Sequence, residues 1–84
     1  MTHTYITEGT CSRQIDVTLD DDEIIKEIKF YGGCMGNTQG VSKLCVGRKA
    51  SEVIDLLRGI DCQGRGTSCP DQLSYALEEA LQEF

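Results

Sequence analysis

The sequence contains no run of apolar residues that approaches the roughly 18 needed to cross a bilayer. Clusters of basic residues are also missing, because the eight Lys and Arg are scattered along the chain and are outnumbered by 14 Asp and Glu, for a net charge of −6. Nucleic-acid surfaces need clustered basic side chains to neutralise phosphates. His3 is the single histidine, and nothing resembles a Ser–His–Asp set. We therefore expect no membrane partner, no nucleic-acid partner and no hydrolase of that type.

The first residues lack both the basic start and the apolar middle of a secretory signal peptide, which favours a cytoplasmic protein. The chain has 84 residues, enough for one domain over residues 1–84 and too few for two. A core of this size gives marginal stability, and small domains often add disulfides or a bound metal. The sequence has five cysteines. In a reducing compartment they are metal ligands or catalytic thiols more often than structural disulfides.

Period-two alternation before residue 32 predicts three β-strands. The alternating segments are residues 3–7, 13–19 and 24–31. The second segment places Ile15, Val17 and Leu19 on one face, as in a half-buried strand. The connections are short, which favours an antiparallel meander because parallel pairing needs a longer crossover.

After residue 31 the apolar period becomes helical. A first helix follows a glycine-rich turn, with Asn37 or Thr38 as its cap, and Ser51 is placed to cap a second helix. Pro70 suits the first position of a last helix, which makes Cys69 its N-cap. The core-facing stripe of this helix consists of Leu73, Ala76, Leu77, Ala80, Leu81 and Phe84. Strands followed by helices predict an α+β domain, a three-stranded antiparallel sheet with about three helices packed on one face.

Four of the cysteines lie in predicted loops or at the ends of predicted elements, where a rigid scaffold usually displays its chemistry. They are Cys11, Cys34, Cys62 and Cys69. At a helix N-terminus, unpaired backbone N–H groups and the positive end of the dipole stabilise a thiolate, the form that binds metal, and this applies to Cys69. Cys45 instead falls on a helical stripe with Val41 and Leu44, so we expect it in the core.

The spacing of the four cysteines leaves more than one chemistry open. No Cys-x-x-Cys pair, the strong zinc signature, is present. The number of these cysteines, the reducing compartment and their positions at loops or element ends favour one shared site. In such a site four thiolates hold zinc or an iron–sulfur cluster, since both accept four cysteines. The alternative is a thiol redox protein with Cys62 and Cys69 as a resolving pair. Plain buried cysteine is the third interpretation, because unpaired cysteine is among the most buried residue types.

With these residues in hand, the sequence resembles the TSCPD domain family. Residues 67–71 read Thr-Ser-Cys-Pro-Asp, the motif that names the domain, and an amphipathic helix follows. Residues 9–12 (Gly-Thr-Cys-Ser), 32–37 (Gly-Gly-Cys-Met-Gly-Asn) and 59–62 (Gly-Ile-Asp-Cys) also look like the short stand-alone members, which carry four characteristic cysteines. The resemblance covers almost the whole chain and leaves Cys45 outside the four.

The resemblance implies an association with ribonucleotide reductase. TSCPD domains also occur attached to ribonucleotide reductases, chiefly adenosylcobalamin-dependent ones, and stand-alone members are often labelled ribonucleoside-diphosphate reductases by that association. This chain is far too short for the catalytic barrel of such an enzyme, so we do not expect an enzyme on its own. The resemblance allows an accessory role beside a reductase, through nucleotide binding or thiol redox chemistry.

A second, fainter resemblance is to NifU-like iron–sulfur cluster scaffold proteins, which implies a cluster-assembly protein as another partner. Residues 23–34 look like the scaffold's third strand and cysteine turn, Cys69 looks like its last cysteine, and Cys11 lies roughly where its first cysteine lies. Cys62 has no counterpart there, and the scaffold's Asp and His near its cysteines are not evident here. A fourth thiolate makes a closed, stable site, as in structural zinc centres.

Overall fold

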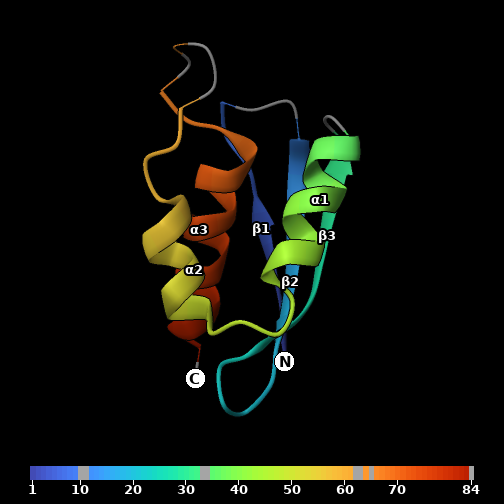
Figure 1. The fold of residues 1–84 in the computed structure, drawn as a ribbon, viewed down its shortest axis with the longest axis vertical. Helices are drawn as coiled ribbons and strands as arrows, with labels where there is room; N and C mark the ends of the chain where they lie inside the picture. The colour runs from blue at the N-terminus through green and yellow to red at the C-terminus, as the bar shows by residue number, and fades with distance from the viewer. Residues whose placement is uncertain (10–11, 33–34, 62–63, 65, 84) are drawn as a thin grey trace.

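The computed structural model describes residues 1–9, 12–32, 35–61, 64 and 66–83, apart from the side chains of residues 35 and 37. Its elements, in chain order, are β1 (Thr2–Ile6), β2 (Ser12–Leu19), β3 (Ile25–Gly32), α1 (Met35–Cys45), α2 (Ala50–Leu57) and α3 (Cys69–Leu81). The strands form an antiparallel sheet in the order β1-β2-β3, and the helices follow in sequence (Figure 1). The predicted α+β class is therefore confirmed.

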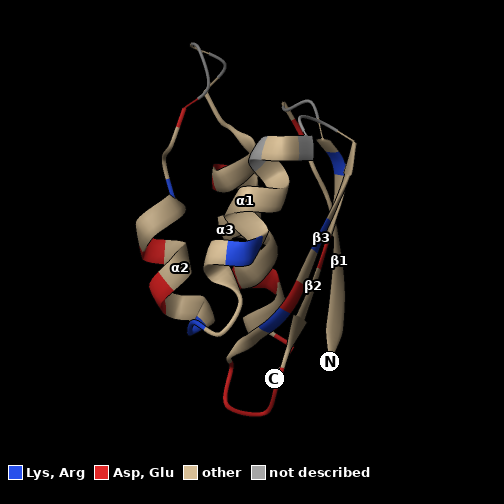
Figure 2. Ribbon diagram, turned by 45° about the vertical axis from the view of Figure 1, so that its right-hand side comes forward, with Lys and Arg blue, Asp and Glu red and all other residues tan. Residues whose placement is uncertain are grey.

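The sheet buries one face and leaves the other exposed to solvent. Ile15, Val17 and Leu19 of β2 are at most 1% exposed, as their alternation predicted. The register sets Tyr5 and Phe30 on either side of Ile15, so an apolar row crosses the three strands. The helices lie on this side of the sheet and leave the opposite side uncovered (Figure 2). This arrangement explains why polar residues alternate with apolar ones along β2.

A shift in the strand register adds one more apolar side chain to the core. Ile25 and Ile28 of β3 are both buried although they are three residues apart. The β2–β3 ladder shifts between Thr18 and Leu19, and such a bulge changes which side chains face the core.

Helix α3 covers β1 and β2, α1 covers β3, and α2 packs against α3. Leu73, Ala76, Leu77 and Ala80 of α3 are completely buried, and Leu81 packs against the same core. The predicted stripe is thus confirmed, except that residue 84 lies outside the described residues. Burying a leucine side chain contributes about 1.5–3 kcal/mol, so this face stabilises the contact between α3 and the sheet.

The predicted start of α1 is wrong, because the helix begins at Met35 and both proposed caps, Asn37 and Thr38, lie inside it. Thr38, the fourth residue of the helix, is buried. The apolar stripe of α1 is only partly confirmed. Cys45 is 6% exposed and belongs to the core, whereas Leu44 is 73% exposed.

The predicted cap of α2 is also wrong, because Ser51 is the second residue of the helix. Lys49 precedes the helix and makes no side-chain cap bond. The first helical N–H, that of Ala50, donates instead to the carbonyl oxygen of Glu23 at 3.0 Å. A contact with the β2–β3 turn therefore satisfies one of the N–H groups at the helix start that have no partner within the helix. No helix in the described part of the chain is long and apolar enough to cross a membrane.

Candidate functional site

The start of α3 is built around a serine cap. Ser68 Oγ accepts a hydrogen bond from the backbone N–H of Asp71 at 3.1 Å, which makes Ser68 the N-cap. Cys69 is the first helical residue and Pro70 the second, so the prediction of Cys69 as N-cap is wrong by one position. A hydroxyl oxygen is a good acceptor for this bond, whereas a thiol sulfur is a weak one. Proline is tolerated in the first turn because its missing N–H has no intrahelical partner there.

Asp71 ties the start of α3 to the end of α2. Its side chain is 4% exposed. Oδ1 accepts the backbone N–H of Gly59 at 2.7 Å, and Oδ2 accepts the hydroxyl of Thr67 at 2.6 Å. Ser68 adds a second tie, because its hydroxyl donates to the carbonyl oxygen of Ile60 at 2.6 Å. The segment that precedes Cys62 in the sequence is thus anchored to the first turn of α3.

Gln72 brings the β1–β2 connection to the same place. Its Nε2 donates to Thr67 Oγ1 at 3.0 Å, and its Oε1 accepts the backbone N–H of Glu8 at 3.0 Å. Gly9 follows with a φ of +76°, and a Cβ at this position would lie 2.9 Å from Cγ2 of Thr67. Both the backbone conformation and the close approach therefore require glycine here.

Cys69 lies where this anchored helix end meets the sheet. Its Sγ is 3.2 Å from Oγ of Ser12, the first residue of β2, and the two residues are 7% and 3% exposed. Ser12 pairs in turn with Gly32, the last residue of β3. We call the meeting point of Glu8–Gly9, Ser12, Gly32 and residues 59–61 and 66–72 the loop junction. In Figure 1 its described residues lie at the end of the molecule opposite the two termini.

The structure places one of the four predicted ligands, Cys69, in the loop junction. Cys11, Cys34 and Cys62 lie outside the described residues. Each is close in sequence to a described residue of the junction: Ser12 follows Cys11, Gly32 comes two residues before Cys34, and residues 59–61 precede Cys62. Within the described residues, which include only Cys69 of the four, no group of three or more His, Cys, Asp and Glu side chains is placed to hold a metal ion.

The side chain of Asp61 accepts hydrogen bonds from two glycines that follow it in the sequence. Its Oδ2 accepts the backbone N–H of Gly64 at 2.6 Å, and its Oδ1 accepts the backbone N–H of Gly66. Gly64 and Gly66 both have positive φ values, +80° and +84°. Aspartate side chains commonly stabilise turns by accepting such bonds from the following backbone.

Cys45 and His3 lie away from the loop junction. Cys45 is in the core, as predicted, and burial raises the pKa of its thiol although the nearby Arg48 opposes the shift. His3 of β1 faces α3, where its Nε2 is 3.0 Å from Oε1 of Glu79 and its Nδ1 contacts Oε2 of Glu83. Its role in the structure is to join the first strand to the last helix.

Two residues of the site, Gln72 and Ser12, were not evident from the sequence. The contact of Gln72 with Glu8 spans 64 residues, and no local pattern signals it. Ser12 had one signal, its position beside Cys11, but the sequence alone does not say that its hydroxyl meets the sulfur of Cys69.

These contacts define a small α+β domain in which the β1–β2 and α2–α3 connections meet at the first turn of the last helix, beside the start of β2. The family model of the TSCPD domain matches residues 1–81, and the chain belongs to the TSCPD domain family, as its sequence predicted. Four of the five motif residues at positions 67–71 build and anchor the start of α3. The remaining motif residue is Cys69, a proposed ligand. Comparisons with curated proteins and with solved structures gave no match. The resemblance to NifU-like scaffolds therefore gains no support from them and stays a prediction.

Proposed function

We propose that this domain binds zinc or an iron–sulfur cluster through the thiolates of Cys11, Cys34, Cys62 and Cys69. The observation that carries the proposal is the loop junction. It places Cys69 Sγ 3.2 Å from the residue that follows Cys11, and this residue pairs with Gly32, two positions before Cys34. The segment just before Cys62 is bonded to the first turn of the same helix. Four cysteines distant in sequence thus have neighbours that belong to one small region.

The surroundings of Cys69 fit a metal-bound thiolate. A thiolate in a buried position needs a cation or hydrogen-bond donors to compensate for lost hydration. The hydroxyl of Ser12 is within reach of Sγ and can donate to it, as residues behind metal ligands commonly do. The first turn of α3 adds the positive end of its dipole. A bound metal would supply the remaining positive charge and crosslink the connections that lead into the junction.

The number of proposed ligands favours a structural or carrier role over a catalytic one. Four cysteines complete the coordination of zinc or of a cluster and leave no open position for a substrate. The 7% exposure of Cys69 also weighs against the redox alternative, in which Cys62 and Cys69 form a resolving pair. Thiol exchange requires an accessible sulfur.

The experiment is a metal analysis of protein purified without oxygen and without a metal-affinity tag. We expect stoichiometric zinc without colour, or iron with acid-labile sulfide and a visible charge-transfer band. The four Cys→Ser variants at positions 11, 34, 62 and 69 should lose the metal, and Cys45→Ala should retain it as the matched control. Wild-type protein without metal, or the same metal content in all five variants, would contradict the shared site.

The cellular partner stays a separate prediction. An accessory role beside a ribonucleotide reductase predicts that nucleotides raise the melting temperature of metal-free protein. Transfer to a cluster-assembly protein predicts instead that a bound cluster leaves the domain when an acceptor protein is added. Neither result is required for the metal site itself.

A further inference from the structure

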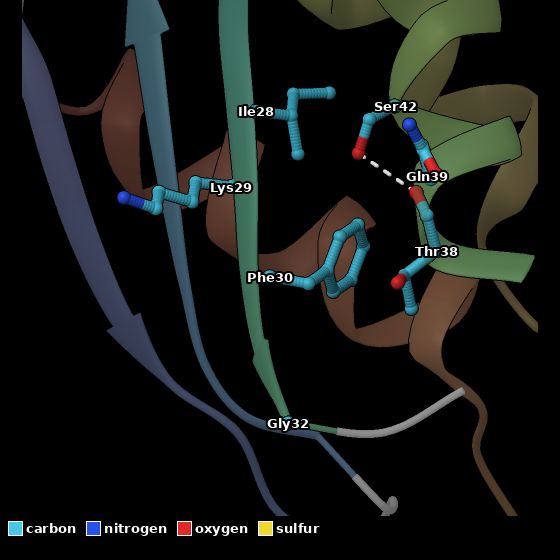
Figure 3. A pocket seen from close by; sticks show the side chains of 7 residues that line it. All are labelled: Ile28, Lys29, Phe30, Gly32, Thr38, Gln39 and Ser42. Carbon is cyan, nitrogen blue, oxygen red and sulfur yellow. Dashed lines mark hydrogen bonds between the residues drawn. The ribbon is translucent and has the colours of Figure 1, made fainter. Parts of the chain in front are cut away.

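A cleft of about 430 Å³ lies between β3 and α1 (Figure 3). Ile28 and Phe30 of β3 form its apolar floor and point toward the helix. Thr38, Gln39 and Ser42 of α1 line the opposite wall, where the hydroxyl of Ser42 donates to the carbonyl oxygen of Thr38 at 2.8 Å. A largely apolar floor with a few polar groups is typical of a binding cleft, and the volume is within the usual range.

The cleft runs along an open edge of the sheet. Strand β3 is the last in the order β1-β2-β3, and only its beginning is paired on the outer side among the described residues. There Ile24 forms an antiparallel bridge with Lys49, and Ile25 exchanges backbone hydrogen bonds with Arg48 (2.9 Å) and Gly47 (2.8 Å). The connection between α1 and α2 thus pairs with residues 24–25 through an isolated bridge and two backbone hydrogen bonds, and this pairing does not continue along the described residues 26–32.

The charge around this edge is opposite to that of the rest of the protein. Residues 24–51 contain one acidic residue, Glu27, and five basic ones, a net charge of +4, whereas the remaining residues carry thirteen acidic and three basic side chains, a net charge of −10. The five are Lys26, Lys29, Lys43, Arg48 and Lys49. Figure 2 shows blue segments on β3 and α1, and red ones on the β2–β3 turn and α2.

Part of this positive charge remains available for a partner. Lys26 is 3.5 Å from Asp20, and Arg48 is 2.9 Å from Glu52, so these two are paired within the domain. Among the described residues, Lys29, Lys43 and Lys49 form no ion pair, and Lys29 lies over the ring of Tyr31.

We propose that the cleft binds an extended acidic peptide segment of a partner protein, which adds to β3 as a fourth strand. The open edge offers main-chain hydrogen bonds, and the cleft accepts an apolar side chain of the segment between Phe30 and α1. The lysines attract its acidic residues. A second copy of this chain is a poorer occupant, because it would bring another surface of net charge +4 to the same edge. Residues 26–32 offer about 20 Å of strand, the length of a six-residue segment.

The test measures peptide binding by full-length protein, with fluorescence anisotropy and with amide chemical shifts of ¹⁵N-labelled protein. The probe is a fluorescein-labelled octapeptide of alternating glutamate and valine. One comparison peptide has lysine in place of glutamate, and another keeps the glutamates but has proline in place of two valines. We expect the acidic probe to bind and to shift amides of residues 26–32 and α1. Both comparison peptides should bind about tenfold more weakly, because one reverses the charge and the other cannot form the strand ladder.

Two pairs of variants separate the cleft and the charge from general effects. Ser42→Leu fills the cleft and should weaken binding of the acidic probe about tenfold, whereas Ser51→Leu on the exposed side of α2 should not. Lys29→Glu should weaken it about threefold, and Arg13→Glu, which changes the net charge equally, should not. Equal binding of the three peptides, or amide shifts that lie outside β3 and α1, would overturn the proposal. The peptide comparison and the shift mapping use wild-type protein, so they decide the question even if a variant does not fold.

Discussion

Replacing Asp71 by alanine removes the carboxylate that ties the start of α3 to the end of α2. Asp71 as a residue is 4% exposed, and its carboxylate accepts two hydrogen bonds, from the backbone N–H of Gly59 at 2.7 Å and from the hydroxyl of Thr67 at 2.6 Å. The Asp71→Ala variant leaves both donors without this acceptor. It does not disturb the serine cap, because that bond uses the backbone N–H of residue 71.

The expected loss follows from these two bonds. A hydrogen bond to a charged group contributes about 1.5–3 kcal/mol, and a carboxylate in the first turn of a helix adds about 0.3–1 kcal/mol through the dipole. The lower part of the summed range applies, because Gly59 is exposed and Thr67 is half-buried, so water can replace some of the contact. We expect Asp71→Ala to lower the free energy of unfolding by about 3–4 kcal/mol. For a chain of 84 residues this is a large share of a total of about 4–13 kcal/mol.

The measurement is urea unfolding at neutral pH, followed by circular dichroism, with the metal content determined on the same samples. Asp71→Asn keeps the shape and one acceptor oxygen, so it should lose about half as much stability. Asp55→Ala removes an exposed aspartate of α2 and should change stability by less than about 0.5 kcal/mol. A loss below about 1 kcal/mol in Asp71→Ala would refute the anchoring role.

Three further predictions concern other parts of the domain. Ser12→Ala removes the hydroxyl beside Cys69 Sγ and should lower metal affinity about tenfold in a chelator competition, and an unchanged affinity would exclude the hydroxyl as a support of the site. Cys45→Val should leave the metal content unchanged. In native wild-type protein, iodoacetamide should not label Cys45, because burial hides its thiol and raises the pKa of that thiol. Labelling of Cys45 in the native protein would contradict this. Hydrogen bonds, first that from Thr4, lower the pKa of Asp16 below its ordinary 3.8, so wild-type protein should lose this stabilisation only as the pH falls below 3.8. Asp16→Asn should lack it at neutral pH and show a flatter acid dependence of stability, and identical curves for the two proteins would refute it.

The fold was predictable where the pattern is local. Alternation identified β2 because Ile15, Val17 and Leu19 all face one core, and the helical stripe identified α3 for the same reason. The ends of the helices were not predictable to the same degree. The first N–H of α2 bonds to Glu23 in the β2–β3 turn, a contact that depends on the tertiary structure, and the sequence analysis assigned the cap to Ser51 instead.

The candidate site was predictable as a set of residue types but not as a set of contacts. The positions of cysteines at predicted loops led to Cys69, and the structure places its sulfur beside Ser12, where the β1–β2 and α2–α3 connections reach the first turn of α3. The residues that hold these connections together were not evident. Gln72 reads as an ordinary helical residue, and its bond to Glu8 exists only because α3 packs across β1. A one-dimensional pattern contains no information on such a pairing.

Helix α3 follows all the other helices and strands in the sequence, yet it packs on the first two strands and contains Cys69. During translation, β1 and β2 therefore leave the ribosome well before the helix that covers their apolar face is synthesised. Ile15 and Val17 of β2 therefore lack one part of their core, the apolar face of α3, until residues 69–81 are available. Metal loading has the same timing. A nascent chain without α3 lacks one proposed ligand and the anchors of two connections, so insertion of zinc or a cluster is expected only after synthesis of the last helix is complete.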